Sequence, residues 1–338
     1  MLTIAVDAMG GQHAPEAVVQ GVADVSLHTD IQCVLAGDAA RIQSILEGVA
    51  YNPERIDIVH AAEVIGLDEE PREAVRRARD ASSLAALQLV RSGRCAAAVT
   101  AGNAGAMLIG GLRAFSLLPG VHKAAMAGVY PRTVEHPGQD RLALALDVGA
   151  TVRCTPPELT QFAVMGAAYA RVISKVDAPR VALLNMGSDA EQGGETLQTA
   201  HRHLSAMRGI NFVGNILGNE LASGQADVVV CEGLVGNIVM RLLESVSTMA
   251  VDLTTATAQR NWRWRAGMAI MASGADRLRA LADYASYGGA PILGLSELVI
   301  KAHRRSTPQS IANAVKVAAK AVRDGAIPAV ANAVGAVQ

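Results

Sequence analysis

The sequence predicts an α/β protein with a doubly wound, Rossmann-like sheet and helices on both faces. Short β-branched runs alternate with longer segments of helical periodicity, a pattern typical of parallel βαβ units. Several of these runs end in Gly next to Asn or Asp, as do turns that lead from a strand into a helix. Hydrophobic residues make up 51% of the 338 residues, which is enough for a sizeable core.

The expected strands are, in chain order, Leu2–Val6, Ile31–Ala36, Ile56–His60, Ala96–Thr100, Ala125–Tyr130, Leu142–Asp147, Val181–Asn185, Asn211–Val213 and Asp227–Cys231. Helical periodicity covers most of the gaps, for example Glu70–Arg91, Ala104–Leu118, Pro157–Lys175, Ala190–Met207 and Asn237–Gln259. No helical segment separates Ala125–Tyr130 from Leu142–Asp147. These two strands are therefore expected to form a hairpin joined by the polar loop Pro131–Arg141.

The chain has no internal repeat, low-complexity segment or long linker, so we expect one two-lobed domain over residues 1–338. A break at Gln259–Asn261 separates the helical patterns Asn237–Ala258 and Trp262–Ala282. These patterns predict a helical hairpin over about residues 237–282, inserted into the α/β fold.

Composition and missing motifs exclude several function classes. The formal charge of −1 gives no basic field for nucleic acid. There is no Walker A motif, no G-x-G-x-x-G after the first strand, no G-x-S-x-G elbow and no compact metal-binding pattern. The four cysteines lie far apart and favour reduced thiols in a cytosolic protein. Neither a signal peptide nor a transmembrane segment is expected.

The loops that follow the strands contain the candidate binding residues, because ligands of open α/β sheets bind at the carboxyl ends of the strands. Glycines there allow close backbone approach, and amides at helix starts bind anions. One such loop is common in any α/β protein, whereas five together indicate a phosphate or similar oxyanion site. His13 is as compatible with loop packing as with catalysis. The candidates are Asp7, Gly10, Gly11, His13, Gly102, Asn103, Gly105, Asp147, Asn185, Gly187, Gly236 and Asn237.

Several of these loops lie in segments that resemble, in order and spacing, the bacterial phosphate acyltransferases of the PlsX family. The segments are AVDAMGGQHAP, TAGNAGAM, LALDVGA, ALLNMGS, DVVVCEGLVGN, YGGAPILGL and VIKAH, and the resemblance runs from about Ile4 to the last helix. It implies a fold related to isocitrate and isopropylmalate dehydrogenases and to phosphate acetyltransferases. It also implies transfer of a long acyl group from acyl carrier protein to inorganic phosphate, for phospholipid synthesis.

The resemblance further implies a cytoplasmic homodimer that needs no cofactor, contacts the inner face of the cell membrane, and supplies a glycerol-3-phosphate acyltransferase downstream. In this reaction phosphate is itself the nucleophile, and a thiol with a pKa near 8.5 is a good leaving group. The protein therefore needs only to position the two substrates and to stabilise the oxyanion. Asn237 is the expected catalytic residue, as a donor to the oxyanion or else as a phosphate ligand, and Gly102 and Asn103 are expected to line the same pocket.

The chain departs from the family at two positions. Gln192 stands where the family pattern has lysine, and Leu217 stands where the pattern Gly-Asn-x-Glu has its carboxylate. Loss of both members of a Lys–Glu pair leaves no unpaired charge. Because it stands in the lysine's place, Gln192 is the second expected catalytic residue, although a neutral amide supplies no charge and would give a weaker site. Two alternatives stay open: a weak or inactive membrane-docked scaffold, and a short-chain phosphate acyltransferase.

Three surface features complete the expectations. Trp262, Arg263 and Trp264 at the hairpin tip suit a lipid interface, or else a dimer contact. Acyl carrier protein is acidic, so a basic docking patch is expected. The two candidate patches are Arg72, Arg76, Arg77 and Arg79 on one helix, and Lys301, Arg304 and Arg305 near the C-terminus.

Overall fold

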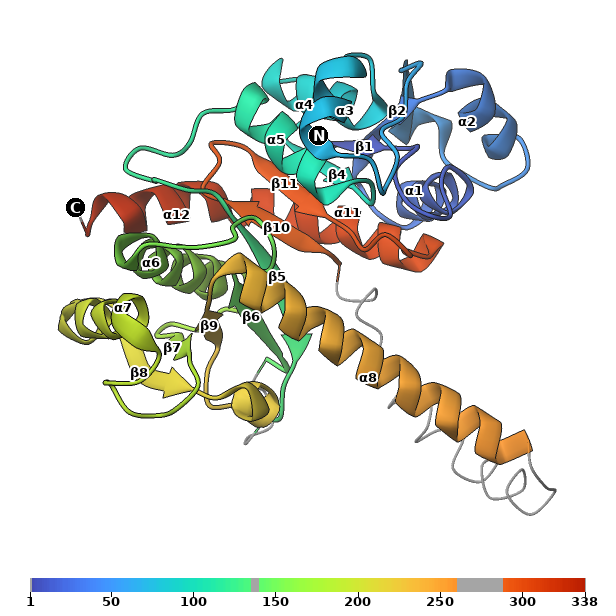
Figure 1. Ribbon diagram of the computed structural model, residues 1–338. Helices are drawn as coiled ribbons and strands as arrows, with labels where there is room; N and C mark the ends of the chain where they lie inside the picture. The colour runs from blue at the N-terminus through green and yellow to red at the C-terminus, as the bar shows by residue number, and fades with distance from the viewer. Residues whose placement is uncertain (1, 135–139, 260–287, 338) are drawn as a thin grey trace.

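The protein is built around one mixed sheet of eleven strands in the order β3-β2-β1-β4-β11-β10-β5-β6-β9-β7-β8. The computed structural model describes residues 2–134, 140–259 and 288–337 (Figure 1). The α/β class expected from the sequence is confirmed, and every strand expected from the sequence is present with slightly shifted bounds.

One half of the sheet is parallel and forms the first lobe. Its strands are β1 (Thr3–Asp7), β2 (Gln32–Gly37), β3 (Ile56–His60), β4 (Ala97–Thr100) and β11 (Leu298–Lys301). Its helices are α1 (Glu16–His28), α2 (Ala39–Leu46), α3 (Pro71–Arg77), α4 (Ser82–Arg91) and α5 (Ala104–Ala114), with a short 3-10 turn η1 (Pro53–Arg55). The strands are almost fully buried at the centre, as expected for a sheet covered on both faces.

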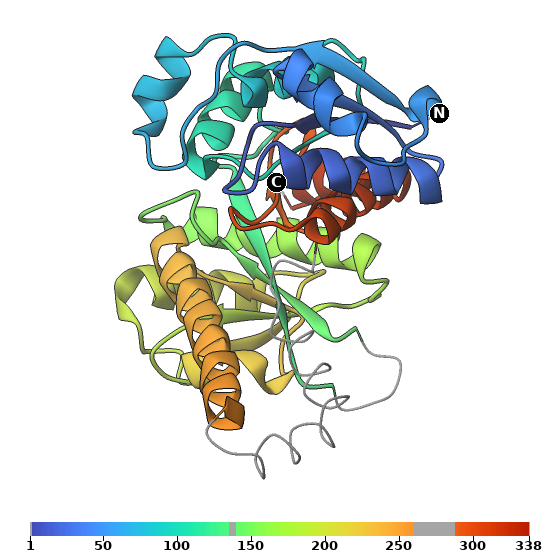
Figure 2. The ribbon, with the colours of Figure 1, turned by 90° about the vertical axis from the view of Figure 1, so that its right-hand side faces the viewer.

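The other half of the sheet forms the second lobe. Its parallel strands are β6 (Leu142–Leu146), β9 (Val228–Val230), β7 (Arg180–Leu184) and β8 (Asn211–Ile216). Its helices are α6 (Pro156–Ile173), α7 (Gly194–Ala206) and α8 (Gly233–Gln259), with the 3-10 turn η2 (Gly218–Ser223). Figure 2 shows the two lobes joined by strands at the middle of the sheet.

Antiparallel strands join the halves. The long strand β5 (Ala125–Pro131) pairs with β10 (Ala290–Leu293) on one side and with β6 on the other. The pairing of β5 with β6 confirms the expected hairpin. The chain ends in α11 (Pro308–Arg323) and α12 (Ala326–Gly335), and α1, α6 and α11 bury one face of the sheet while α4, α5 and α8 bury the other.

Two expectations about the elements were wrong. The helix expected over Glu70–Arg91 is two helices, α3 and α4, because the backbone at residues 80–82 turns aside to hydrogen-bond with Glu63. Strands β10 and β11 were not expected from the sequence, since each has only four residues and β10 contains Pro291. Together they place the C-terminal part of the chain at the centre of the sheet.

Helix α8 extends away from the body of the protein (Figure 1) and carries an exposed apolar stripe. The stripe comprises Leu234, Val235, Ile238, Leu242, Val246, Met249 and Leu253. Helix α8 corresponds to the first arm of the expected hairpin. The second arm and the expected membrane residues Trp262, Arg263 and Trp264 lie outside the described residues. No helix in the described part of the chain is long and apolar enough to cross a membrane.

Candidate active site

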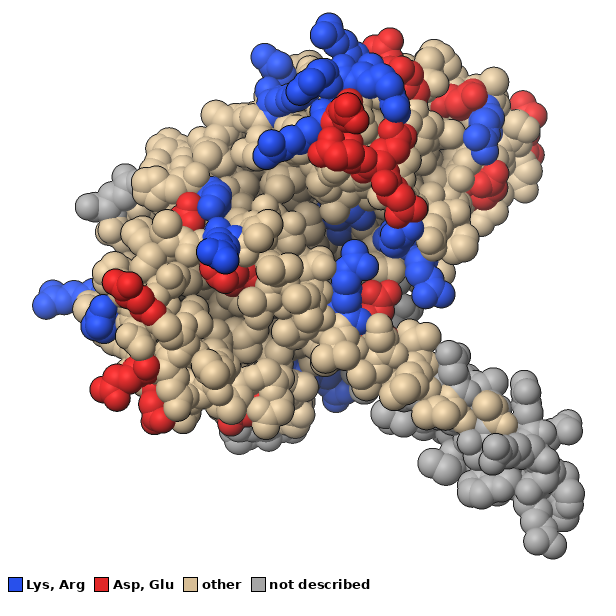
Figure 3. All heavy atoms as spheres, in the orientation of Figure 1, with Lys and Arg blue, Asp and Glu red and all other residues tan. Residues whose placement is uncertain are grey.

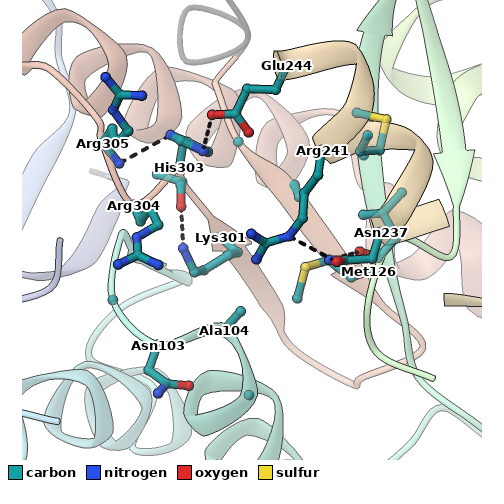
Figure 4. A pocket seen from close by; sticks show the side chains of 18 of the residues that line it. Asn103, Ala104, Met126, Asn237, Arg241, Glu244, Lys301, His303, Arg304 and Arg305 are labelled. Atoms are coloured by element: carbon teal, nitrogen blue, oxygen red, sulfur yellow. Dashed lines mark hydrogen bonds and ion pairs between the residues drawn. The ribbon is translucent and has the colours of Figure 1, made fainter. Parts of the chain in front are cut away.

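A cavity of about 420 Å³ lies between the two lobes. Its walls come from the β4–α5 junction, β5, the loop after β6, the first turns of α8, and the loop after β11. Figure 4 shows side chains of the β4–α5 junction, β5, α8 and the loop after β11 around one space. The cavity therefore brings together segments that are more than two hundred residues apart in the chain.

The start of α5 forms one wall. The side-chain oxygen of Asn103 accepts a hydrogen bond from the amide of Ala106 at 3.0 Å and so caps the helix. Its amide nitrogen donates to the backbone oxygens of Gly66 and Glu69, at 3.1 and 3.0 Å. Because the Asn103 side chain is fully engaged and takes up the amide of Ala106, the groups that α5 offers the cavity are the amides of Ala104 and Gly105, which lack intrahelical partners.

Asp7 fixes the loop that presents these amides. Its carboxylate accepts hydrogen bonds from the hydroxyls of Ser82 and Thr100, both at 2.6 Å, and Thr100 in turn accepts one from the amide of Gly102 at 2.9 Å. A side chain at Gly10 would begin 2.7 Å from the Gly102 nitrogen, so the loops after β1 and β4 meet through glycine. Burial raises the pKa of the Asp7 carboxyl, against these hydrogen bonds.

Lys301, the last residue of β11, supplies a buried cation. Its side chain lines the cavity and donates a hydrogen bond to the backbone oxygen of Ala302. Burial lowers the pKa of the Lys301 amine to about 8, and the Asp7 carboxylate acts in the opposite direction. A lysine that has lost part of its hydration gains from an incoming anion, because the anion restores favourable electrostatic contact.

The loop after β11 brings further polar groups. His303 accepts a hydrogen bond from the amide of Arg305 at Nδ1, so its neutral ring carries the proton at Nε2, where Glu244 of α8 lies at 3.1 Å. This contact links the first lobe to α8 across the mouth of the cavity. Arg304 pairs with Asp68 at 3.4 Å, and its buried Nε has no hydrogen-bond partner among the described residues.

The first turns of α8 form the opposite wall. The amide nitrogen of Asn237 donates to the backbone oxygen of Val148 at 3.2 Å, and its side-chain oxygen accepts from Nε of Arg241 at 3.0 Å. One amide hydrogen of Asn237 and the outer nitrogens of Arg241 are left to face the cavity, and Figure 4 shows the Arg241 guanidinium directed toward Lys301.

Asp147 and two glycines hold this wall of the cavity in position. The buried Asp147 carboxylate accepts hydrogen bonds from the amides of Met126, Gly149, Ala150 and Thr151, at 2.8 to 3.0 Å. A side chain at Gly236 would begin 1.9 Å from the backbone oxygen of Asp147, so α8 can approach the loop only through glycine. Gly233 packs against the same loop.

Replacing Gly236 with alanine should therefore push α8 away from the loop after β6. We expect the free energy of unfolding to fall by about 1–3 kcal/mol, the usual cost of overpacking. Chemical denaturation measures this change. Gly335→Ala is the matched control, because its new methyl group would meet open space. Equal stability of the two variants would contradict the packing assigned to Gly236.

The cavity suits an anion. Lys301, Arg241, Arg304 and Arg305 line it together with the amides of α5, while Glu244 is the one carboxylate among the described lining residues. Cations held around a partly dehydrated space favour a multiply charged oxyanion over a neutral ligand.

Comparison with known proteins decides the family. A sequence profile described as "Fatty acid synthesis protein" matches residues 2–328. The phosphate acyltransferase of Nitratidesulfovibrio vulgaris (strain DP4) is 36% identical over 316 residues, which cover 94% of this chain and 90% of the relative. The chain belongs to the phosphate acyltransferase family.

Solved structures confirm the fold that the phosphate acyltransferase family was expected to have. A phosphotransacetylase from Streptococcus pyogenes aligns with a TM-score of 0.63 at 16% identity, covering 97% of this chain and 94% of that one. A 4-hydroxythreonine-4-phosphate dehydrogenase from Klebsiella pneumoniae aligns with a TM-score of 0.54 at 14% identity, covering 95% and 99%. The phosphate acyltransferase chain thus has the isocitrate dehydrogenase-like fold of these enzymes.

Only part of the expected phosphate acyltransferase site lies on the cavity. Gly102, Asn103, Gly105 and Asn237 line it. Asp7, Gly10, Asp147 and Gly236 lie behind the lining and hold it in place. Gly11 takes a positive φ of 121° in the loop after β1, and His13 in the same loop is exposed. Neither of these two residues is among those that line the cavity.

A second group of expected residues lies together, but in another loop. The Asn185 amide nitrogen donates to the backbone oxygen of Gln192 at 3.1 Å, and the Gln192 side chain donates to Asp189 at 3.2 Å. The Gln192 amide lies directly over Gly187, where a methyl group would clash. This loop follows β7 and does not line the cavity, so a role for Asn185, Gly187 and Gln192 stays a prediction.

Sequence reasoning did not assign Lys301, Arg241 and Glu244 to the site. Lys301 was placed instead in a surface patch with Arg304 and Arg305, but its side chain is buried in the cavity. The signal available in the sequence was the segment VIKAH, in which a lysine follows an apolar run at a strand end. Recognising it required knowing that Leu298–Lys301 is a strand beside β4.

Proposed function

We propose that the chain transfers a long-chain acyl group from acyl carrier protein to inorganic phosphate in this cavity. The activity class follows from the family, and the finer assignment of acyl donor and site rests on the cavity. The observation that carries the proposal is the buried Lys301 amine facing the same space as the first-turn amides of α5. Neither feature has an obvious use in a protein that only binds a neutral ligand.

Phosphate is seated by charge and by backbone amides. The ammonium group of Lys301 faces it from β11, the amides after Gly102 from α5, and the guanidinium of Arg304 from the third side. Asp7 acts as a positioning residue, because it fixes Thr100 and through it the Gly102 amide. This arrangement needs no nucleophilic Ser or Cys, since phosphate is the attacking group.

Reaction then requires the thioester carbonyl to lie between phosphate and α8. A phosphate oxygen attacks the carbonyl carbon, and the free amide hydrogen of Asn237 donates to the developing oxyanion, with Arg241 beside it. The carbon–sulfur bond breaks and leaves acyl phosphate and a thiolate. The thiolate takes up the proton that hydrogen phosphate brought, so the free carrier thiol is released and charge balances.

Release of free thiol from long-chain acyl carrier protein tests this function directly. We expect release that depends on phosphate, with an acyl phosphate formed in equal amount. Carrier-protein binding without such release would favour the inactive scaffold. Release from acetyl thioesters but not from long-chain ones would favour the short-chain alternative.

Gln192→Lys tests whether the loop after β7 takes part. Since Gln192 lies outside the cavity lining and its side chain bonds to Asp189, we expect turnover to change less than about threefold, as for surface substitutions. The matched control is Gln225→Lys, which adds the same charge at an exposed position elsewhere in the second lobe. A gain of tenfold or more in Gln192→Lys alone would show that this loop reaches the reaction.

We further propose that two copies associate through α8. Its exposed stripe of large apolar residues is of the kind that interfaces bury, whereas single scattered apolar residues would need no explanation. A cytoplasmic homodimer held at the inner face of the membrane, passing acyl phosphate to a glycerol-3-phosphate acyltransferase, is consistent with such a surface. No cofactor takes part in the proposed reaction. Sedimentation of the whole protein measures the association.

A further inference from the structure

A second cationic surface lies on the first lobe, away from the cavity. Figure 3 shows Lys and Arg side chains gathered over the region of α3, α4 and α5. Arg79, Arg91 and Arg113 are exposed there, and among the described residues none of these three forms an ion pair with a carboxylate. Elsewhere on the same lobe Arg94 and Arg323 are paired, with Asp57 and Asp30. Three unpaired guanidinium groups repel one another, so their gathering is a cost to the isolated protein.

The three arginines surround a groove of about 270 Å³. Arg79 comes from the connection between α3 and α4, Arg91 from the end of α4, and Arg113 from the end of α5, so the fold gathers charges that are separate in the sequence. Apolar side chains floor the groove, contributed by Val75, Leu84 and Leu87. An apolar floor inside a cationic rim matches a partner that carries acidic residues around an apolar one.

We propose that this groove docks the acidic carrier protein whose acyl group the cavity consumes. The identity of the partner rests on the proposed function. The choice of this surface rests on the charges around the groove and on its apolar floor. The other basic candidate is unsuitable for docking a folded protein, because Lys301 is buried and Arg304 and Arg305 line the cavity itself.

The groove is within reach of the cavity. Helix α5 begins at the cavity with Ala104 and carries Arg113 in the groove, nine residues later, which corresponds to about 13 Å along the helix axis. A carrier that docks at the groove would need only a flexible thioester arm of that length to enter the cavity. Docking and reaction are then separate contacts on opposite ends of one rigid helix.

Several carboxylates between the groove and the cavity already have hydrogen-bond or ion-pair partners. Glu69 pairs with Arg77, and Asp68 pairs with Arg304. Glu70 accepts hydrogen bonds from the amides of Arg72 and Glu73 and caps α3. These carboxylates therefore oppose an acidic partner less than their number suggests.

The double variant Arg91→Glu, Arg113→Glu tests the proposal. We expect KM for acyl carrier protein to rise on the order of tenfold with kcat retained, because reversed rim charges slow association. Turnover of the same acyl group on pantetheine, which has no protein to dock, should not change. The control Arg202→Glu, Arg208→Glu adds the same charge on exposed positions of the other lobe and should behave as the parent. Thermal melting checks that both variants are folded.

Direct binding separates this proposal from the proposed function. Fluorescence anisotropy with labelled carrier protein should show weaker binding to the groove variant alone, and added salt should weaken binding of the parent most. That result would stand even if no thioester were turned over. Equal carrier binding by both variants would overturn the proposal. Loss of binding to anionic phospholipid vesicles with carrier binding retained would also overturn it, and would make the groove a membrane contact.

Discussion

Replacing Lys301 with methionine is expected to lower kcat/KM for phosphate by about 10²- to 10³-fold, as when one strong donor is removed from a preorganised anion site. Methionine keeps most of the apolar volume of the lysine stem, so β11 should keep its place between β4 and β10. The loss comes from the missing charge. Initial rates at varied phosphate measure it, and a chemical denaturation curve shows whether the fold is retained. A loss of less than threefold would remove Lys301 from the site.

The pH profile gives an independent measure of the same residue. The Lys301 amine, with its pKa lowered to about 8 by burial, is charged below that pH and neutral above it. We therefore expect kcat/KM for phosphate to fall as pH rises through about 8. In Lys301→Arg the guanidinium keeps its charge, so this alkaline fall should disappear even if the rate at pH 7 is lower. An unchanged alkaline limb in that variant would assign the fall to another group.

Replacing Asn237 with leucine is expected to lower kcat by about 10²- to 10³-fold with a small effect on KM for phosphate, because a donor to the developing oxyanion is lost. Leucine is close to asparagine in size and adds no charge to the cavity. In Lys301→Met the loss is expected in kcat/KM for phosphate, whereas in Asn237→Leu it is expected in kcat, since Asn237 faces the carbonyl and not the seated phosphate. Asn332→Leu on α12 is the control for the substitution itself, on an exposed position. A large rise in KM for phosphate in Asn237→Leu would instead make Asn237 a phosphate ligand.

The α/β class and the loops that form the cavity could be predicted because both depend on local sequence. Gly102 and Asn103 closely follow a buried strand, and Asn237 lies in the second turn of the helix that follows Val228–Val230. What the sequence could not show is which loops share a cavity. Asn185 and Gln192 have the same Gly and Asn signature as Asn103, yet their strand β7 lies beyond β9 in the second lobe.

The missed cation has a similar cause. Lys301 enters the cavity only because β11 pairs with β4, a contact between residues about two hundred positions apart. Short strands such as Ala290–Leu293, with its proline, carry little periodicity of their own. Their conformation is set by neighbouring strands, and those neighbours are not encoded locally.

The position of β11 also bears on how the chain reaches its native state during synthesis. Strands β1 to β4 leave the ribosome early, but β4 keeps an open hydrogen-bonding edge until Leu298–Lys301 has been made and inserted beside it. A nascent chain that ends before this segment would expose that edge and the apolar faces around it, a state prone to aggregation and suited to chaperone binding. The first lobe can be finished only after Leu298–Lys301 has been translated, about two hundred residues after β4.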